Sequence, residues 1–250
     1  MLKDERYDKI LSLLEEGQYI SATALSKKLY VSLPTVRRDL AELQRRNLIV
    51  RSHGGAKRIH SEHVVAPLRY RQTVNANEKR MLCKEAAAMV RDNEIIFIDA
   101  STTTLQMADF LGEKKQITVI TNGIPLATML VQRGIKTYCT GGEIFENSLA
   151  HFGSFAEDFI RRFNIDTFFF SCHGISEKGM LTDPSLPETQ IRRVAISQSK
   201  KRVFLCDETK FSRSTPYNLV PIHTVDCVIT NTDTVYRYFR GEDRDKVIIV

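Results

Sequence analysis

Hydroxyl and guanidinium side chains gather near residue 35 of this 250-residue chain. Ser32 and Thr35 flank Pro34, and Arg37 and Arg38 follow two residues later. Such groups donate hydrogen bonds to phosphate oxygens, and arginine also recognises the edge of guanine in the DNA major groove. Their spacing predicts a helix that begins near Ser32 and presents donors for nucleic acid.

Two short helices joined by a tight turn are predicted to position these donors. Ser21 and Ser32 are good N-caps because a serine hydroxyl accepts from the free amides of the first turn. Pro34 falls in the first turn of the second helix, where its missing N–H costs no helix hydrogen bond. Apolar residues recur from Val36 at spacings of four and three, which gives one buried face. This pattern is typical of a helix-turn-helix whose second helix enters the major groove.

A β-hairpin is predicted after the second helix. Residues 48–50 are β-prone, and Gly54 and Gly55 permit a tight turn before the chain returns. Such a hairpin would serve as a wing that offers positive side chains to the DNA backbone or the minor groove. The expected wing donors are Arg51, His53, Lys57 and Arg58.

Positive charge is concentrated in this part of the chain. Residues 17–60 contain nine Lys or Arg and two acids, a net charge of +7, whereas the whole chain carries +6. A basic face of this kind indicates a partner that is a polyanion. The alternative is a plain bundle of amphipathic helices with solvated arginines. The caps, the spacing, the hairpin and the charge agree in favouring a DNA-binding head.

Several classes of protein are excluded or disfavoured by the whole sequence. The five cysteines are at least 21 residues apart, which predicts reduced thiols rather than a zinc or redox site. The N-terminus is charged from residue 3, and no apolar run is long enough to cross a membrane. We therefore expect a cytoplasmic protein with no membrane partner, no cofactor and no metal. His60, Glu62 and His63 could in principle bind a metal, but solvated linker residues are the better interpretation.

Strands and helices alternate in the rest of the chain, which predicts an α/β fold. Residues 60–75 interrupt the periodicity and contain Pro67, so we expect a linker there. Asn75 and Glu78 predict a capping box at the start of the next helix. The expected organisation is a winged helix-turn-helix head at 1–59, a linker at 60–75 and an α/β body at 76–250. Strands are expected at 95–99, 117–120, 136–139, 167–170, 203–206, 225–230 and 247–250, and helices near 75–90, 125–132 and 186–199.

A hydroxyl-rich loop after the first of these strands predicts an anion site. Asp99 ends the strand, and Ser101, Thr102, Thr103 and Thr104 lead into a helix. Backbone amides, hydroxyls and the positive end of a helix converge in such a loop. The threonines could also simply cap the helix, which does not exclude ligand binding. Because parallel strands end at one edge of a sheet, where α/β folds bind ligands, we add the next two loops to the site. Their residues are Thr121, Asn122, Gly141 and Gly142.

The segment SLPTVRRDLAELQRRNLIVRSHGGA resembles the signature of the DeoR family of bacterial sugar-metabolism repressors. The succession of strands and loops that follows also resembles the family's sensor domain, which is similar to the ribose-phosphate isomerase class of sugar-phosphate folds. The resemblance covers nearly the whole chain. It implies a winged-helix head whose DNA contacts fall on Ser32, Pro34, Thr35, Arg37 and Arg38, and a body that binds a phosphorylated sugar.

The resemblance also implies which residues bind that effector. Lys210, Arg192 and the amides of the threonine loop would neutralise the phosphate, while Asp99 and Asp207, with Asn122, would bind sugar hydroxyls. Two positions depart from the family pattern, which usually has glycine at Ser101 and an acid at His173. His173 could pair with a phosphate or act as a neutral loop donor. Lys210 could also be an ordinary surface lysine. The full implied set is Asp99, Ser101, Thr102, Thr103, Thr104, Thr121, Asn122, Gly141, Gly142, Gly153, His173, Gly174, Glu188, Arg192, Asp207 and Lys210.

The function expected from these features is a transcriptional repressor of a carbohydrate operon. Its partners would be double-stranded operator DNA, a phosphorylated sugar and further copies of the chain in a dimer or tetramer. One alternative is a sugar-phosphate isomerase-like enzyme with an appended DNA-binding head, which would use carboxylates such as Glu188 as acids and bases. Another is a nucleoid or RNA-binding protein without a small ligand. We expect a regulator rather than an enzyme, because a DNA-binding head makes ligand sensing the simpler use of the pocket.

Overall fold

The structure is a computed structural model that describes residues 3–14, 19–45, 48–52, 54–58, 68–239 and 241–250. The chain divides into two compact units, Met1–Ala66 and Pro67–Val250. We call them the head and the body, and each is described by itself. Predictions made for His53, His60, Glu62 and His63 fall outside the described residues.

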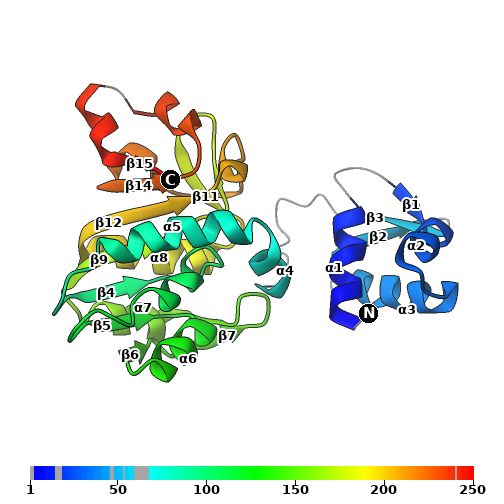
Figure 1. Cartoon of the computed structure of the whole chain (residues 1–250), viewed down its shortest axis with the longest axis horizontal. Coiled ribbons are helices and arrows are strands. Elements are labelled where there is room, and N and C mark those ends of the chain that lie inside the picture. Colours follow the sequence, from blue (N-terminus) through cyan, green and yellow to red (C-terminus); the bar gives the residue numbers. More distant parts are fainter. Residues whose placement is uncertain (1–2, 15–18, 46–47, 53, 59–67, 240) are drawn as a thin grey trace. The chain divides into compact units, whose positions relative to one another are not determined.

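The described part of the head combines three helices with a three-stranded antiparallel sheet (Figure 1). Its core is made of aliphatic side chains from all three helices, among them Ile10, Leu25, Leu40 and Leu43. This arrangement confirms the expected winged helix-turn-helix. The helices are α1 (Lys3–Leu13), α2 (Ala22–Leu29) and α3 (Leu33–Arg45); the strands are β1 (Tyr19–Ser21), β2 (Ile49–Ser52) and β3 (Gly55–Arg58), in the order β1-β3-β2.

Both predicted N-caps of the head are confirmed. The Ser21 hydroxyl accepts from the Ala24 amide across 3.1 Å, and the Ser32 hydroxyl accepts from the Thr35 amide across 3.4 Å. The strand β1 was not expected, and Gly55 explains how it fits. A Cβ atom at Gly55 would lie 2.3 Å from the Ile20 carbonyl oxygen. Glycine therefore lets β1 pair closely with β3.

A seven-stranded parallel sheet forms the centre of the body, as the α/β alternation predicts (Figure 1). All neighbouring strands in it run in the same direction, so their carboxyl ends lie at one edge. Its order is β15-β14-β12-β9-β4-β5-β6, and the strands are β4 (Ile95–Ile98), β5 (Thr118–Thr121), β6 (Lys136–Cys139), β9 (Ile165–Phe170), β12 (Ser199–Cys206), β14 (Cys227–Thr230) and β15 (Val247–Ile249).

Helices cover both faces of this sheet, which explains its nearly continuous apolar strands. In β9, Phe169 packs toward one face, while Phe168 and Phe170 pack toward the other. One face is covered by α5 (Ala76–Ala88), α6 (Ile124–Gln132) and the 3₁₀ helix η1 (Thr104–Asp109). The other is covered by α7 (Ser154–Ile160), α8 (Leu186–Gln198) and part of a small sheet.

Short antiparallel strands lie beside the main sheet and were missed from the sequence. One small sheet contains β10 (Gly174–Ile175), β11 (Met180–Asp183) and β13 (Tyr217–Pro221). The hairpin of β7 (Glu143–Phe145) and β8 (Ala150–Phe152) forms the other. Strands of two to five residues are too short to show a clear alternation of apolar and polar residues. The remaining short helices are η2 (Glu208–Lys210), η3 (Ile222–Thr224), η4 (Asp233–Arg237) and η5 (Gly241–Lys246).

The linker prediction was wrong for residues 68–75, because a short helix, α4 (Leu68–Thr73), belongs to the body. Leu68 is buried, and the Lys79 ammonium donates to the Arg71 carbonyl, so tertiary contacts hold a helix whose periodicity is too short to recognise. The capping box was also wrong. Asn75 has a left-handed backbone and makes no capping bond, and its side-chain amide donates instead to Asp207 across 3.3 Å.

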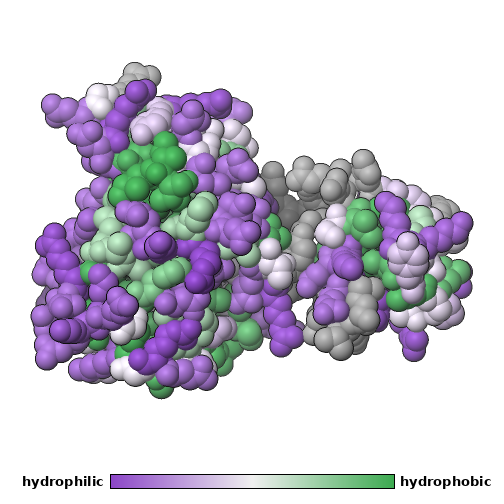
Figure 2. All heavy atoms as spheres, viewed as in Figure 1, coloured by the Kyte–Doolittle hydropathy of each residue, from purple (hydrophilic) through white to green (hydrophobic). Residues whose placement is uncertain are grey.

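Hydrophilic side chains cover much of the body, but an apolar region lies near its C-terminal strands (Figure 2). Ile249 on the edge strand β15 is 44% exposed. Across the described ranges, the chain contains no helix with the length and apolar character needed to cross a membrane.

Candidate functional site

The exposed face of α3 carries arginines that other side chains of the head do not neutralise. Arg37 and Arg38 are exposed, and neither makes a salt bridge to a described residue. Arg45 on the same helix differs, because it binds Glu42 through two hydrogen bonds of 2.7 and 2.9 Å. Asp39 is buried and binds Arg6 of α1, so its charge is also matched within the head. Uncompensated positive charge therefore falls on Arg37 and Arg38.

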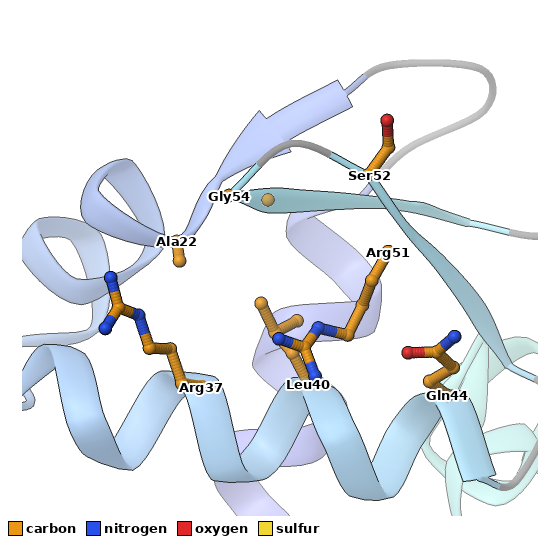
Figure 3. Close-up of a pocket in the computed structure, with 8 residues that line it drawn as sticks. Ala22, Arg37, Leu40, Gln44, Arg51, Ser52 and Gly54 are labelled. Atoms are coloured by element: carbon orange, nitrogen blue, oxygen red, sulfur yellow. The ribbon is translucent and has the colours of Figure 1, made fainter.

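A hollow lies between α3 and the β2–β3 hairpin, and its polar side chains come from both (Figure 3). Figure 3 shows Arg37 and Gln44 projecting from α3 and Arg51 reaching from β2 toward α3. Guanidinium and amide groups on a helix and a wing are suited to phosphate oxygens and base edges. The geometry thus places Arg37 and Arg51, predicted separately, on one surface. Lys57 is exposed on β3, and the Ser32 and Thr35 hydroxyls lie 2.9 Å apart at the start of α3.

In the body, polar residues converge at the carboxyl edge of the parallel sheet. We call this group the edge site; it comprises Arg71, Lys79, Asp99, Ser101, Thr102, Thr103, Thr104, Asn122, Ser148, His173, Asp183, Glu188, Arg192, Asp207, Lys210 and Arg213. They follow strands β4, β5, β9, β11 and β12 or lie on helices α4, α5, α8 and η2 and in nearby loops.

Asp99 organises the threonine loop. One carboxylate oxygen accepts from the Ser101 amide and the Thr104 hydroxyl, at 3.2 and 2.9 Å. The other accepts from the Ser171 amide at 3.4 Å and from Arg192 at 2.9 Å. Four donors therefore fill the carboxylate. This use of Asp99 is structural, and it leaves little capacity for the sugar hydroxyls that we had assigned to it.

Arg192 on α8 is surrounded by three carboxylates. Its guanidinium donates to Asp99, to Asp183 across 2.8 Å and to Glu188 across 3.3 Å. Burial opposes its charge, yet Asp183 and the other two acids outweigh this and hold the pKa of Arg192 above its usual range. Burial raises the pKa of the Asp183 carboxyl to about 6, against the lowering effect of Arg192. Arg192 is thus already neutralised and is poorly placed to neutralise a phosphate as well.

Two lysines, Lys79 and Lys210, supply positive charge to the edge site. Burial lowers the pKa of Lys79 to about 8, with Lys210 adding to the fall and Asp207 opposing it. Burial also lowers the pKa of Lys210, which lies half-buried on η2, and Asp207 again opposes it. The Lys79 ammonium donates to the Thr102 hydroxyl across 3.4 Å. The charge of Lys79 therefore reaches the threonine loop.

His173 is neutral in this environment. Burial lowers its pKa far below the usual range, and Lys210 and Arg213 lower it further. The Arg213 guanidinium lies 3.1 Å from its Nε2 atom, which must accept because arginine can only donate. Of the two interpretations of His173, the structure therefore favours the neutral loop residue over a charged phosphate partner.

A small hollow of about 10 Å³ opens within the edge site. Its walls include Arg71 of α4, Ser148 of the β7–β8 turn and Glu188 of α8. The Ser148 hydroxyl is buried and has no hydrogen-bond partner among the described residues. Asn122 also lines the hollow, but its amide already joins two loops by accepting from the Ala100 amide and donating to the His151 carbonyl.

Two family models match the chain, and together they span most of it. The DeoR-like helix-turn-helix domain matches residues 6–62, and the DeoR C terminal sensor domain matches residues 74–232. The chain belongs to the DeoR family.

Curated DeoR-type relatives agree with this assignment over almost their full length. The HTH-type transcriptional regulator GolR of Listeria innocua is 33% identical over 92% of this chain and 91% of its own. The glycerol-3-phosphate regulon repressor of Escherichia coli is 30% identical and covers 92% of both chains. The transcriptional repressor AccR of Agrobacterium fabrum is also 30% identical, over 92% of this chain and 90% of its own. The chain is thus a DeoR-family transcriptional regulator.

Solved structures similar to this DeoR chain include a regulator and an enzyme. The full-length sorbitol operon regulator SorC of Klebsiella pneumoniae has a TM-score of 0.44 at 10% identity, covering 94% of this chain and 98% of its own. Ribose 5-phosphate isomerase A of Methanocaldococcus jannaschii has a TM-score of 0.42 at 18% identity, covering 55% of each chain.

Some residues expected to bind effector in this DeoR body also have structural roles. A Cβ atom at Gly142 would lie 2.5 Å from the Phe152 carbonyl oxygen, and one at Gly174 would lie 2.3 Å from the Arg213 carbonyl oxygen. Gly153 is the N-cap of α7 and has a positive φ, and the fully buried Thr121 hydroxyl accepts from the Gly123 amide. Gly141 also has a positive φ and follows β6.

Sequence reasoning missed five edge-site residues: Arg71, Lys79, Ser148, Asp183 and Arg213. Arg71 fell within the presumed linker, although Pro67 just before it could have signalled a helix start. Ser148 and Asp183 belong to the short antiparallel segments that were not recognised. Among the described residues, no group of three or more His, Cys, Asp or Glu side chains is placed to hold a metal ion.

Proposed function

We propose that this regulator represses a carbohydrate operon by binding operator DNA through its head, and that a phosphorylated sugar bound at the edge site lowers its operator affinity. The observation that carries the effector half is the pair Lys79 and Lys210. Both have a pKa lowered by burial, with Asp207 as the nearby carboxylate that opposes the shift. A phosphate would supply further negative charge beside them, so binding of such an anion is favourable.

The DNA half of the proposal is supported by the hollow between α3 and the hairpin. Arg37, Gln44 and Arg51 line it together. Arg37 and Arg38 would bind backbone phosphates or base edges, and Lys57 would bind a flanking phosphate. Repression as the direction of regulation is supported by two relatives whose names contain the word repressor, AccR and the glycerol-3-phosphate regulon repressor. A regulator of operator DNA would work in the cytoplasm.

We also propose that the regulator acts as a dimer or tetramer. Two heads would then bind two half-sites about one helical turn apart, and a change in their spacing would reduce affinity. The exposed Ile249 on the edge strand β15 supports self-association. Light scattering coupled to gel filtration tests it, and a monomer at micromolar concentration would contradict it.

An enzymatic role is the second candidate, and the edge site disfavours it. Isomerisation of a sugar phosphate needs a carboxylate free to move a proton. Asp99 already accepts from four donors, and Glu188 is bound to Arg192. Turnover of a phosphorylated sugar by the purified chain would contradict the proposal.

The central experiment selects DNA with the full-length protein and then attempts to release it. Sequences enriched from a random pool would provide the operator, and binding should exceed that to unrelated DNA by roughly a thousandfold or more. Phosphorylated sugars and their unphosphorylated parents are then added to the complex at constant ionic strength. We expect a phosphorylated compound to release the DNA and its parent to have no effect. Binding without sequence preference would instead support a nucleoid or RNA-binding role.

A further inference from the structure

The helix α3 and the β2–β3 hairpin face each other across the hollow of the head, which measures about 290 Å³. We call it the head hollow. In Figure 3 the side chains of Arg37 and Gln44 project from α3, and Arg51 projects from β2 toward α3. The other lining residues are mostly small or apolar and leave the space between these polar side chains clear: Ala22, Leu40, Ser52, Gly54 and Gly55.

The local structure of both elements explains why donors point into the head hollow. On α3, Arg37 precedes Leu40 by three residues and Gln44 follows it by four, so all three lie on one face of the helix. Leu40 is buried and anchors that face to the core. On β2, Ile49 is buried, and Arg51 lies two residues later on the same side of the strand. The two guanidinium groups therefore come from opposite walls.

The charges of Arg37 and Arg51 have no counterpart in the head. Both side chains are exposed, and the described part of the chain provides neither of them with a hydrogen bond or an ion pair. None of the described residues that line the head hollow is acidic. Two unneutralised guanidinium groups on opposite walls favour an anionic occupant, and their planar forks match the oxygens of a phosphate.

The geometry of double-helical DNA indicates which anion would lie there. An α-helix fits the major groove, which is about 12 Å wide and is bordered on each side by a sugar-phosphate strand. With α3 in that groove, the hairpin beside α3 lies beyond one border. The strand that forms this border would then pass between α3 and the hairpin. Phosphates rather than base edges would meet Arg37 and Arg51.

Arg38 lies on another side of α3, although it follows Arg37 directly. One residue of an α-helix turns by roughly 100°. Arg38 accordingly lines a separate groove of about 420 Å³ between α1 and α3, together with Thr35. Arg45, the third arginine of α3, is already bound by Glu42. Arg38 is therefore the arginine of α3 that remains available for base edges.

We propose that the head hollow holds one backbone strand of the operator, with Arg37 and Arg51 binding its phosphates from opposite walls and Gln44 adding a neutral donor, while Arg38 reads bases. This inference rests on the proposed function, because it assigns separate roles to residues of the operator-binding surface. The affinity contributed by the head hollow would then be independent of the DNA sequence.

The test uses the full-length protein and an operator selected from a random pool. Affinity is measured over a range of salt concentrations, and the selection is repeated with each variant to obtain its base preference. Arg45→Ala is the matched control, because it removes an arginine of α3 that Glu42 already neutralises. The variants are Arg37→Ala, Arg51→Ala, the double variant of these two, Gln44→Ala and Arg38→Ala.

Arg37→Ala and Arg51→Ala should each weaken binding by about tenfold on every sequence, without a change in base preference. The slope of log affinity against log salt should become shallower by about 0.9 in each and by about 1.8 in the double variant. Gln44→Ala should lose about threefold with the slope unchanged, because no charge is removed. Arg38→Ala should relax the preference at one base pair. Arg45→Ala should resemble wild type.

Ethylation of single phosphates in the operator tests whether one strand is held. Ethylation removes the charge of a phosphate, so it should weaken wild-type binding at each contacted position. Arg37→Ala and Arg51→Ala should become insensitive at neighbouring phosphates of the same strand. Arg37→Lys and Arg51→Lys retain the charge and should keep the salt slope of wild type. If an alanine variant is unstable on thermal melting, the lysine variant and the ethylation pattern of wild type decide the question.

A changed base preference in Arg37→Ala or Arg51→Ala would overturn the inference, as would insensitivity at phosphates of opposite strands. An unchanged salt slope in both variants, or an equal change in Arg45→Ala, would also overturn it. An unchanged base preference in Arg38→Ala would overturn the assignment of base reading. All these outcomes leave the proposed function intact, because the wild type still recognises its operator. A wild type that binds every DNA sequence equally would contradict the proposed function itself.

Discussion

The Arg192 guanidinium on α8 donates to the Asp183 carboxylate on β11 across 2.8 Å, and both side chains are buried. The same guanidinium binds Asp99 at the end of β4. One arginine thus holds together the main sheet, the small antiparallel sheet and a covering helix. The contact fixes the floor of the edge site, because Asp99 in turn positions the threonine loop.

Replacing Arg192 with methionine should destabilise the body strongly. The change leaves the buried Asp99 and Asp183 and the half-buried Glu188 without their partner, and breaking a buried ion pair from one side costs about 3–5 kcal/mol. Urea unfolding of the full-length protein measures the loss. Arg193→Met is the matched control, because Arg193 is the next residue in α8 and is exposed. This variant should lose about 1 kcal/mol or less of stability. Equal losses in the two variants would contradict the role of Arg192.

His173 should make the protein lose stability in acid. Its pKa is lowered on folding, so its contribution is fully present above the unfolded value of about 6.5 and is lost as the pH falls below it. Asp183 acts in the opposite direction, because its raised pKa favours the folded state as the pH falls through about 6.

The comparison of wild type with His173→Gln separates the two effects, since Asp183 is common to both. Between pH 7.5 and 4.5, wild type should lose stability relative to the variant, by at most about 1.4 kcal/mol per pH unit. Glutamine can still accept a hydrogen bond from Arg213. Parallel stability curves for the two proteins would show that His173 is not held neutral.

Phosphate affinity should fall as the pH rises above 8. The pKa of Lys79 is lowered to about 8, so this cation loses its proton there, whereas inorganic phosphate is already a dianion. Because an anion nearby favours the charged lysine, affinity should fall by up to about tenfold per pH unit. Lys79→Met should flatten the profile between pH 7 and 9, whereas Lys84→Met, an exposed position on the same helix, should not. A profile unchanged by Lys79→Met would remove that lysine from the account.

Arg37→Ala should weaken operator binding while preserving the response to effector. Arg37 is an exposed donor without a salt-bridge partner in the described head, and loss of one base or phosphate contact costs about 1–3 kcal/mol. If the contact is to a phosphate, the slope of log affinity against log salt should fall by about one. Arg45→Ala is the control, because Glu42 already binds Arg45.

Lys210→Ala should do the reverse, with operator binding kept and the effector response lost. Operator titrations with and without a phosphorylated sugar measure both properties. The same phenotype from Arg37→Ala and Lys210→Ala would contradict the separation of functions between head and body.

Local rules were sufficient where the chain determines its own structure over short distances. The caps at Ser21 and Ser32 and the apolar repeat that begins at Val36 predicted the head, and the apolar strands predicted the parallel sheet. These features depend on hydrogen bonds and apolar burial between residues that are close in the sequence. The position of the candidate site at the carboxyl edge followed from the parallel direction of the strands.

Rules based on neighbouring residues failed where contacts between residues distant in the sequence determine the structure. Asn75 has the sequence of a cap, but its side chain binds Asp207 instead. Arg71 lies on a helix of six residues that tertiary contacts hold, so its periodicity carries little information. The sequence assigned Arg192 to a phosphate. No local pattern reveals that Asp183 lies beside Arg192 and already neutralises it. The charge balance of the edge site depends on residues that the folded sheet brings together, so it could not be predicted from the sequence.

The most direct test of the account is thermal melting of the full-length protein with phosphorylated sugars and their unphosphorylated parents. A ligand that binds the native state stabilises it by about 2.7 kcal/mol at a hundred times its dissociation constant. The account predicts that at least one phosphorylated sugar raises the melting temperature while its parent leaves it unchanged. No shift with any phosphorylated compound, or an equal shift with its parent, would contradict the claim that the edge site recognises a sugar phosphate.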